Sequence, residues 1–197
     1  MTTTDISPSF EDVLVPNITN NTTSIRSKTD AFRGHGEEAT GDRAEWGKVI
    51  TAKLDWFDYI GTVEEGRTKA LEWILTHDPS LPPNSLSSTS ESTIIPYDMI
   101  ITTDTLYSPL LTLPHLSTLR SFSLLSLSSS PPPIYVALET RDPALIAHSL
   151  ALAKEMGFSL KKIALGRVDK ALGKSGWGWE DREEWEGIEI WKWKYGG

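Results

Sequence analysis

Acidic residues directly follow three of the chain's β-prone runs, and each stands shortly before a proline that can begin a helix. In an open parallel sheet, ligands bind in the crevice beyond the carboxyl ends of the strands, so side chains at these positions face the ligand. The alternative is that each acid only caps the helix that follows it. Because the arrangement recurs, we predict that the three carboxylates line one crevice. They are Asp5 before Ser7-Pro8, Asp104 before Ser108-Pro109, and Glu139 before Asp142-Pro143.

Trp56 adds a large aromatic side chain at the end of a weaker apolar run, Val49 to Leu54. An indole ring can stack on a purine ring. The sequence therefore predicts a ligand site in which Trp56 lies beside the acids.

The sequence offers few ligands for a metal ion. It has no cysteine, and its four histidines, His35, His77, His115 and His148, are widely scattered. Structural and catalytic metal sites usually gather cysteine, histidine and carboxylate ligands in one place. We therefore predict no metal site.

Composition and charge limit the class of protein. The 197 residues, of which 39% are hydrophobic, are enough for one buried core, so we predict that 1–197 form a single domain. Met1 to Phe10 lacks the features of a signal peptide, and no apolar run is long enough to cross a membrane. The net charge of -8 argues against a nucleic-acid surface and is compatible with a basic protein substrate. We predict a soluble protein of the cytoplasm, the nucleus or both, with no membrane or nucleic-acid partner.

Apolar runs predict the strands that position these residues. Ile100-Ile101 and Ile134 to Leu138 are typical of parallel strands buried on both faces, and Val49 to Leu54 is a weaker third candidate. Leu160 to Val168 and Gly187 to Tyr195 predict an antiparallel hairpin at one edge of the sheet, with no helix between them.

Helices and loops are predicted between the strands. One helix begins at Asp142-Pro143, an N-cap followed by a first-turn proline, and ends at Gly157. Val63 to Leu75 and Leu110 to Phe122 also have the apolar spacing of helices. Residues 21–47 and 78–93 are polar stretches that predict mobile loops.

The order and spacing of these segments resemble the seven-stranded, S-adenosylmethionine-dependent methyltransferases. Within them the chain is similar to the protein-lysine methyltransferase-like group, methyltransferase family 16, and most of all to its methyltransferase-like 22 branch. The segments that carry the resemblance are Asp98 to Tyr107 for a fourth strand ending in D-x-x-Y, Thr2 to Asp5 with the spaced Asn17 and Asn20 for the second strand and helix, Leu54-Asp55-Trp56 for an L-x-W element, Ala137 to Arg141 for the fifth strand, and Trp185 to Trp191 for the last strand.

The resemblance implies an α/β, Rossmann-like fold. Its seven-stranded sheet is mostly parallel, in the order 3-2-1-4-5-7-6, with an antiparallel C-terminal hairpin. The implied cofactor is S-adenosyl-L-methionine, and the implied substrate is a lysine side chain of a protein. The implied catalytic residues are Asp104 and Tyr107, and Tyr107 would border the lysine channel. The structural alternative for Tyr107 is a core tyrosine with a satisfied hydroxyl.

The resemblance also implies a role for each binding residue. Carried over position by position, the cofactor would be bound by Asp5 at the ribose, Trp56 at the adenine, and Thr103 with Asp104 near the methionine part. The substrate would be bound by Tyr107, Glu139 and Arg141.

The chain departs from this family at its start. The family has a first strand and a glycine-rich turn before its second strand, where the backbone approaches the cofactor. Here Gly34-His35-Gly36 and Gly176-Trp177-Gly178 both lie in polar segments, and neither follows an apolar strand. We therefore expect a partial, N-terminally truncated methyltransferase domain that lacks the central strand of the sheet.

Three functions follow from these residues. The first is a protein-lysine methyltransferase. The second is a non-catalytic remnant or binding module that keeps the fold without the cofactor pocket. The third is another α/β nucleotide-cofactor enzyme that acts on a small molecule.

Overall fold

The computed structural model describes residues 2–5, 12, 15–20, 50–77, 97–125, 131–175 and 186–196. The predicted loops 21–47 and 78–93 lie outside these ranges. The chain forms two compact units, Met1–Asp55 with His77–Ser80, and Trp56–Thr76 with Leu81–Gly197.

The first unit contains a two-stranded parallel sheet of β1 (Thr2–Asp5) and β2 (Ile50–Lys53). Thr2 lies opposite Ile50 and Asp5 opposite Lys53, so the chain runs in the same direction in both strands. The strand predicted within Val49 to Leu54 is confirmed as β2.

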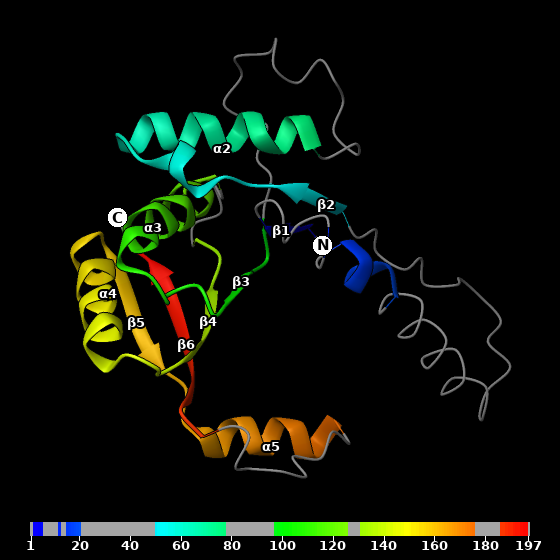
Figure 1. Cartoon of the computed structure of the whole chain (residues 1–197), viewed down its shortest axis with the longest axis vertical. Helices are drawn as coiled ribbons and strands as arrows, with labels where there is room; N and C mark the ends of the chain where they lie inside the picture. Colours follow the sequence, from blue (N-terminus) through cyan, green and yellow to red (C-terminus); the bar gives the residue numbers. More distant parts are fainter. Residues whose placement is uncertain are drawn as a thin grey trace, which may run out of the picture. The chain divides into compact units, whose positions relative to one another are not determined.

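The second unit is an α/β fold built on a mixed, four-stranded sheet (Figure 1). Its strands are β3 (Ile100–Thr103), β4 (Ile134–Glu139), β5 (Phe158–Lys162) and β6 (Ile188–Tyr195), in the order β3-β4-β6-β5. The strands β3 and β4 are parallel, whereas β6 is antiparallel to both of its neighbours. The predicted antiparallel hairpin is therefore confirmed as β5 and β6, with β5 at the edge of the sheet.

The prediction that no helix separates the two strands of this hairpin is wrong. The strand β5 ends at Lys162, and α5 (Leu165–Ser175) follows it. The run that predicted one strand, Leu160 to Val168, thus spans the end of a strand and the first turn of a helix. Leu165, Val168 and Leu172 are three and four residues apart, which is a helical period.

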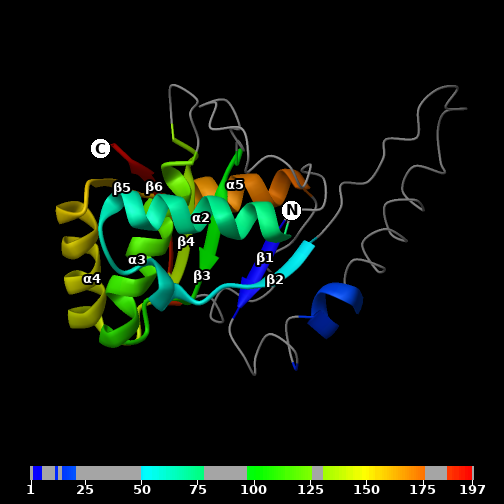
Figure 2. The ribbon, with the colours of Figure 1, turned by 90° about the horizontal axis from the view of Figure 1, so that it is seen from above.

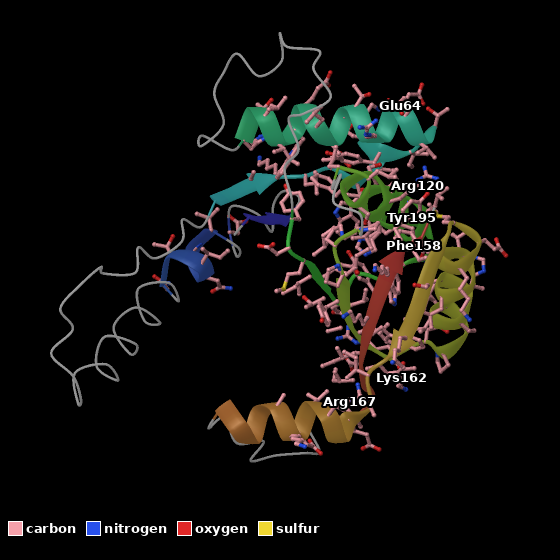
Figure 3. All side chains as sticks on the ribbon, turned by 180° about the vertical axis from the view of Figure 1, so that it is seen from behind. Glu64, Arg120, Phe158, Lys162, Arg167 and Tyr195 are labelled. Carbon is pink, nitrogen blue, oxygen red and sulfur yellow. The ribbon has the colours of Figure 1, made fainter. Side chains whose placement is uncertain are left out.

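The main core lies on one face of this sheet. Ile134, Val136 and Leu138 of β4 are buried there against Leu116 and Ile146, which come from α3 (Pro109–Ser123) and α4 (Pro143–Glu155). Phe158 and Tyr195, labelled in Figure 3, pack edge to face at one end of the same face, with ring centroids 5.2 Å apart.

The opposite face of the sheet is more open than predicted. Ile101 lies on that face of β3 and is 65% exposed, and the residues of β4 that alternate with its buried ones are half-buried. The prediction that both strands are buried on both faces is therefore wrong for β3. The two helices that form the core come from one side, and an apolar run does not specify how many faces are covered.

The helix α4 confirms the predicted caps. The carboxylate of Asp142 accepts hydrogen bonds from the backbone N–H groups of Ala144 and Leu145, at 3.0 and 3.1 Å. Gly157, with a φ of 96°, follows the C-cap, where glycine reverses the chain without strain. The helix predicted over Val63 to Leu75 is also confirmed, as α2 (Val63–His77), and Thr62 and Glu65 form a capping box at its start.

The helix α3 is buried although it is rich in serine and threonine. The hydroxyls of Thr112, Thr118, Ser121 and Ser123 each donate to the carbonyl oxygen four residues earlier. Because these bonds satisfy the hydroxyl donors locally, the helix can be buried without further polar partners. The helix predicted over Leu110 to Phe122 is confirmed as α3.

The helix α2 runs over α3, and the two come close at Gly66 (Figures 1 and 2). A Cβ atom built on Gly66 would collide with the Oγ of Ser121 and would lie 3.5 Å from its Cβ. The aromatic rings of Trp73 and Phe122 meet at the same interface. The missing side chain at Gly66 therefore sets the distance between the helices.

Replacing Gly66 with alanine is expected to lower the free energy of unfolding by about 1–2 kcal/mol, because overpacking outweighs the helix propensity that alanine gains. The double variant Gly66→Ala/Ser121→Ala is expected to recover most of the loss, since it removes the colliding oxygen. Gly166→Ala, on α5, is the control because nothing lies within 4 Å of its Cβ position. Urea denaturation measures all three, and strictly additive effects of the two α2–α3 substitutions would contradict the close approach.

Candidate functional site

The carboxyl ends of the parallel strands β3 and β4 lie at the same end of the sheet. Thr103 is opposite Ala137, and the backbone N–H of Asp104 donates to the carbonyl oxygen of Ala137 at 2.9 Å. Glu139 is the last residue of β4, two positions further along. The prediction that Asp104 and Glu139 lie at the carboxyl ends of parallel strands, at the same end of the sheet, is confirmed for these two residues.

Arg141 connects these two acids. Its Nε donates to Oε2 of Glu139 at 2.7 Å, and a terminal guanidinium nitrogen lies 2.5 Å from the same oxygen and 3.7 Å from Oδ2 of Asp104. The hydrogen bond from Arg141 holds the pKa of Glu139 below its ordinary value. All three side chains are between 40% and 64% exposed. Water screens ion pairs of this kind, so Arg141 offsets part of the negative charge of the acids without being held tightly.

The backbone of Asp104 is in the left-handed region, with a φ of 50°. Asp104 is the one non-glycine residue at positive φ among those that the structure describes. Aspartate and asparagine tolerate this conformation better than most residues, and such strain often occurs at functional sites. The chain therefore turns sharply where β3 ends, and the Asp104 side chain stays at the surface.

A buried hydrogen-bond chain lies beneath this turn. The hydroxyl of Thr102 donates to Oγ1 of Thr105 at 3.0 Å, and Oγ1 of Thr105 is 3.0 Å from Nε2 of His115 on α3. His115 is 3% exposed, and its burial lowers its pKa to about 4, so the ring is neutral at physiological pH. Neither Thr105 nor His115 was among the site residues predicted from the sequence.

Trp56 packs against the ring of His115. It begins the short helix η2 (Trp56–Tyr59), and its ring centroid is 4.8 Å from that of His115, with the planes tilted by 53°. The indole is half-buried. Trp56, predicted as the aromatic of the site, is thus joined to the Asp104 turn through His115 and Thr105.

The remaining predicted residues divide between the two units. Thr103 is exposed at the end of β3, and Tyr107 is 58% exposed, which excludes the alternative of a core tyrosine. Asp5 ends β1 in the first unit, so its place in a shared crevice stays a prediction. The second unit therefore brings together Thr103, Asp104, Tyr107, Glu139, Arg141 and, through His115, Trp56.

In the ranges that the structure describes, no group of three or more histidine and carboxylate side chains could hold a metal ion. None of the helices in these ranges combines the length and the apolar composition that crossing a bilayer requires. Comparison with known proteins finds no family model and no curated protein that matches the chain. The functional argument therefore rests on the geometry of the site.

Proposed function

We propose that the chain is an S-adenosylmethionine-dependent methyltransferase that acts on lysine side chains of proteins. The observation that carries the proposal is the strand order β3-β4-β6-β5, with β6 antiparallel to its neighbours and an acid at the carboxyl end of both β3 and β4. This order matches the 4-5-7-6 half of the methyltransferase sheet. The parallel pair β1 and β2 fits its second and third strands.

The residues at the carboxyl edge suit a cationic cofactor and a cationic substrate. Asp104 and Glu139 present exposed carboxylates, and the half-buried indole of Trp56 is linked to the Asp104 turn through His115 and Thr105. S-adenosylmethionine would supply a methyl group activated by a sulfonium. We assign Asp5 to its ribose, Trp56 to its adenine, and Thr103 with Asp104 to its methionine part.

The chain's own residues would position and deprotonate the lysine. Methyl transfer is an in-line displacement, so the protein mainly fixes geometry and excludes water. The carboxylate of Asp104 would accept a proton of the incoming ammonium, and Tyr107 would border its path, because both side chains are exposed at the same turn.

Arg141 must leave the acids before a cation can bind there. Exposed ion pairs contribute about 0–1 kcal/mol, so an ammonium group can replace the guanidinium at little cost. In this proposal Arg141 offsets one of the two negative charges of the empty site and then contacts the substrate.

One observation favours a second candidate, the non-catalytic binding module. Arg141 bridges Asp104 and Glu139. A site in which the acids stay paired would hold the edge of the sheet together without binding a cofactor.

Equilibrium dialysis with radiolabelled S-adenosylmethionine distinguishes the two candidates. The methyltransferase is expected to bind it, and Trp56→Leu is expected to weaken binding about tenfold, the effect of losing roughly 1.4 kcal/mol of ring contact. Phe57→Leu is the matched control, since Phe57 is the next residue and is 53% exposed. Absence of binding at millimolar cofactor would contradict the methyltransferase and support the binding module.

A further inference from the structure

The turn that carries Asp104 needs support from its neighbours. A left-handed conformation at a non-glycine residue is strained and persists where the surroundings hold it. On one side, the Asp104 N–H continues the ladder to Ala137. On the other side, the next residue, Thr105, is 9% exposed and turns its hydroxyl inward.

The direction of the hydrogen bond between Thr105 and His115 depends on the tautomer of the histidine ring. Thr102 donates to Thr105, so the hydrogen of the Thr105 hydroxyl is available for Nε2 of His115. Nε2 accepts this hydrogen in the tautomer whose proton lies on Nδ1, and it donates to Thr105 in the other tautomer. The hydrogen-bond chain thus connects Thr102, near the end of β3, with His115 in the middle of α3.

Packing alone does not explain a histidine at position 115. Its Nδ1 is buried and has no hydrogen-bond partner among the described residues. A buried polar atom without a partner is unfavourable, and an apolar side chain of similar size would avoid that cost. What the ring does provide is a hydrogen-bond partner for Thr105 and an aromatic contact for Trp56.

We infer that Thr105 and His115 are positioning residues for Asp104. The hydrogen-bond chain Thr102–Thr105–His115 fixes the left-handed turn that presents the Asp104 carboxylate, and the same ring packs against Trp56. Neither Thr105 nor His115 touches the reacting groups. The effect on activity rests on the proposed function, whereas the effect on the turn does not.

Hydrogen–deuterium exchange on the whole chain, without any cofactor, tests the positioning directly. Thr105→Val keeps the shape of the side chain and removes the hydroxyl, so the backbone amides of Asp104 to Tyr107 are expected to exchange at least about tenfold faster. Exchange in β4 is expected to stay unchanged. Ser149→Ala is the matched control. It removes another buried hydrogen bond between two hydroxyls, the one of 3.2 Å between Ser149 and Thr112, which is not part of the turn.

Variants at His115 separate the hydrogen bond from the packing. His115→Gln retains a side-chain acceptor and is expected to keep slow exchange in the turn, whereas His115→Leu is expected to behave like Thr105→Val. If exchange of the turn is unchanged in both Thr105→Val and His115→Leu, the positioning role is wrong.

Kinetics add a readout that a purely structural role would not change. In an active methyltransferase, Thr105→Val is expected to lower kcat about tenfold or more and to leave the KM for the cofactor within about twofold. A chain that has no activity but shows the faster exchange would contradict the proposed function and keep the positioning role. An equal loss in Ser149→Ala would contradict the positioning role instead.

Discussion

Asp104→Asn is expected to lower methyl transfer at least about a hundredfold, the scale of losing a positioned acid–base group. The substitution isolates the charge, because asparagine tolerates the left-handed backbone at φ 50° as aspartate does. Asp104→Ala would also strain the turn and mix two effects. Transfer of a labelled methyl group to lysine, measured beside circular dichroism of the same samples, gives the result.

Asp98→Asn is the matched control for this prediction. Asp98 is an exposed aspartate that precedes β3 at the opposite end of the strand. Its replacement changes the net charge equally and is expected to leave the rate within about twofold. If Asp104→Asn retains full activity, Asp104 is not catalytic, although the methyltransferase proposal itself could stand.

Acidification from pH 6.5 to pH 4 is expected to lower the free energy of unfolding by roughly 3 kcal/mol through His115 alone. Burial lowers the pKa of His115 from 6.5 to about 4, so the unfolded chain takes up the proton first. The stability of the neutral form is therefore complete above pH 6.5 and is lost as the pH falls toward 4. Urea denaturation at a series of pH values measures this slope.

The variant His115→Gln removes this titration, and its stability is expected to depend less steeply on pH than that of the wild type. The difference between the two proteins isolates His115, because carboxylates such as Glu139, whose pKa is lowered, also lose stability in acid. His148→Gln, at an exposed position of α4, is the control and should keep the wild-type slope. Parallel pH profiles for wild type and His115→Gln would show that His115 is not buried in its neutral form.

Local signals predicted most of the second unit. The strand β4 and the helix α4 were predictable because a short apolar run and the Asp142-Pro143 cap act within a few residues. The helix α5 was missed because the apolar run of β5 continues into its first turn. The exposure of Ile101 depends on which helices cover the sheet, and that information is not local.

The candidate site was predictable where it depends on strand direction. Parallel pairing alone brings Asp104 and Glu139 to one edge. The link from Thr105 to His115 was not predictable, because it depends on how α3 returns across the end of β3. A single histidine among serines, threonines and leucines of a helix carries no local signal that it lies beneath a functional turn.

The position of β6 has a consequence for synthesis on the ribosome. It is the last strand in sequence, yet it lies between β4 and β5 and supplies every backbone partner that β5 has in the sheet. Translation at about 5–20 residues per second separates the end of β5 from the start of β6 by roughly 1–5 s. During that interval no strand lies between the facing edges of β4 and β5. The apolar side chains of the core that later surround Trp193 of β6 are not yet covered by it. The nascent chain is therefore most open to chaperone binding or to mispairing just before its final strand emerges.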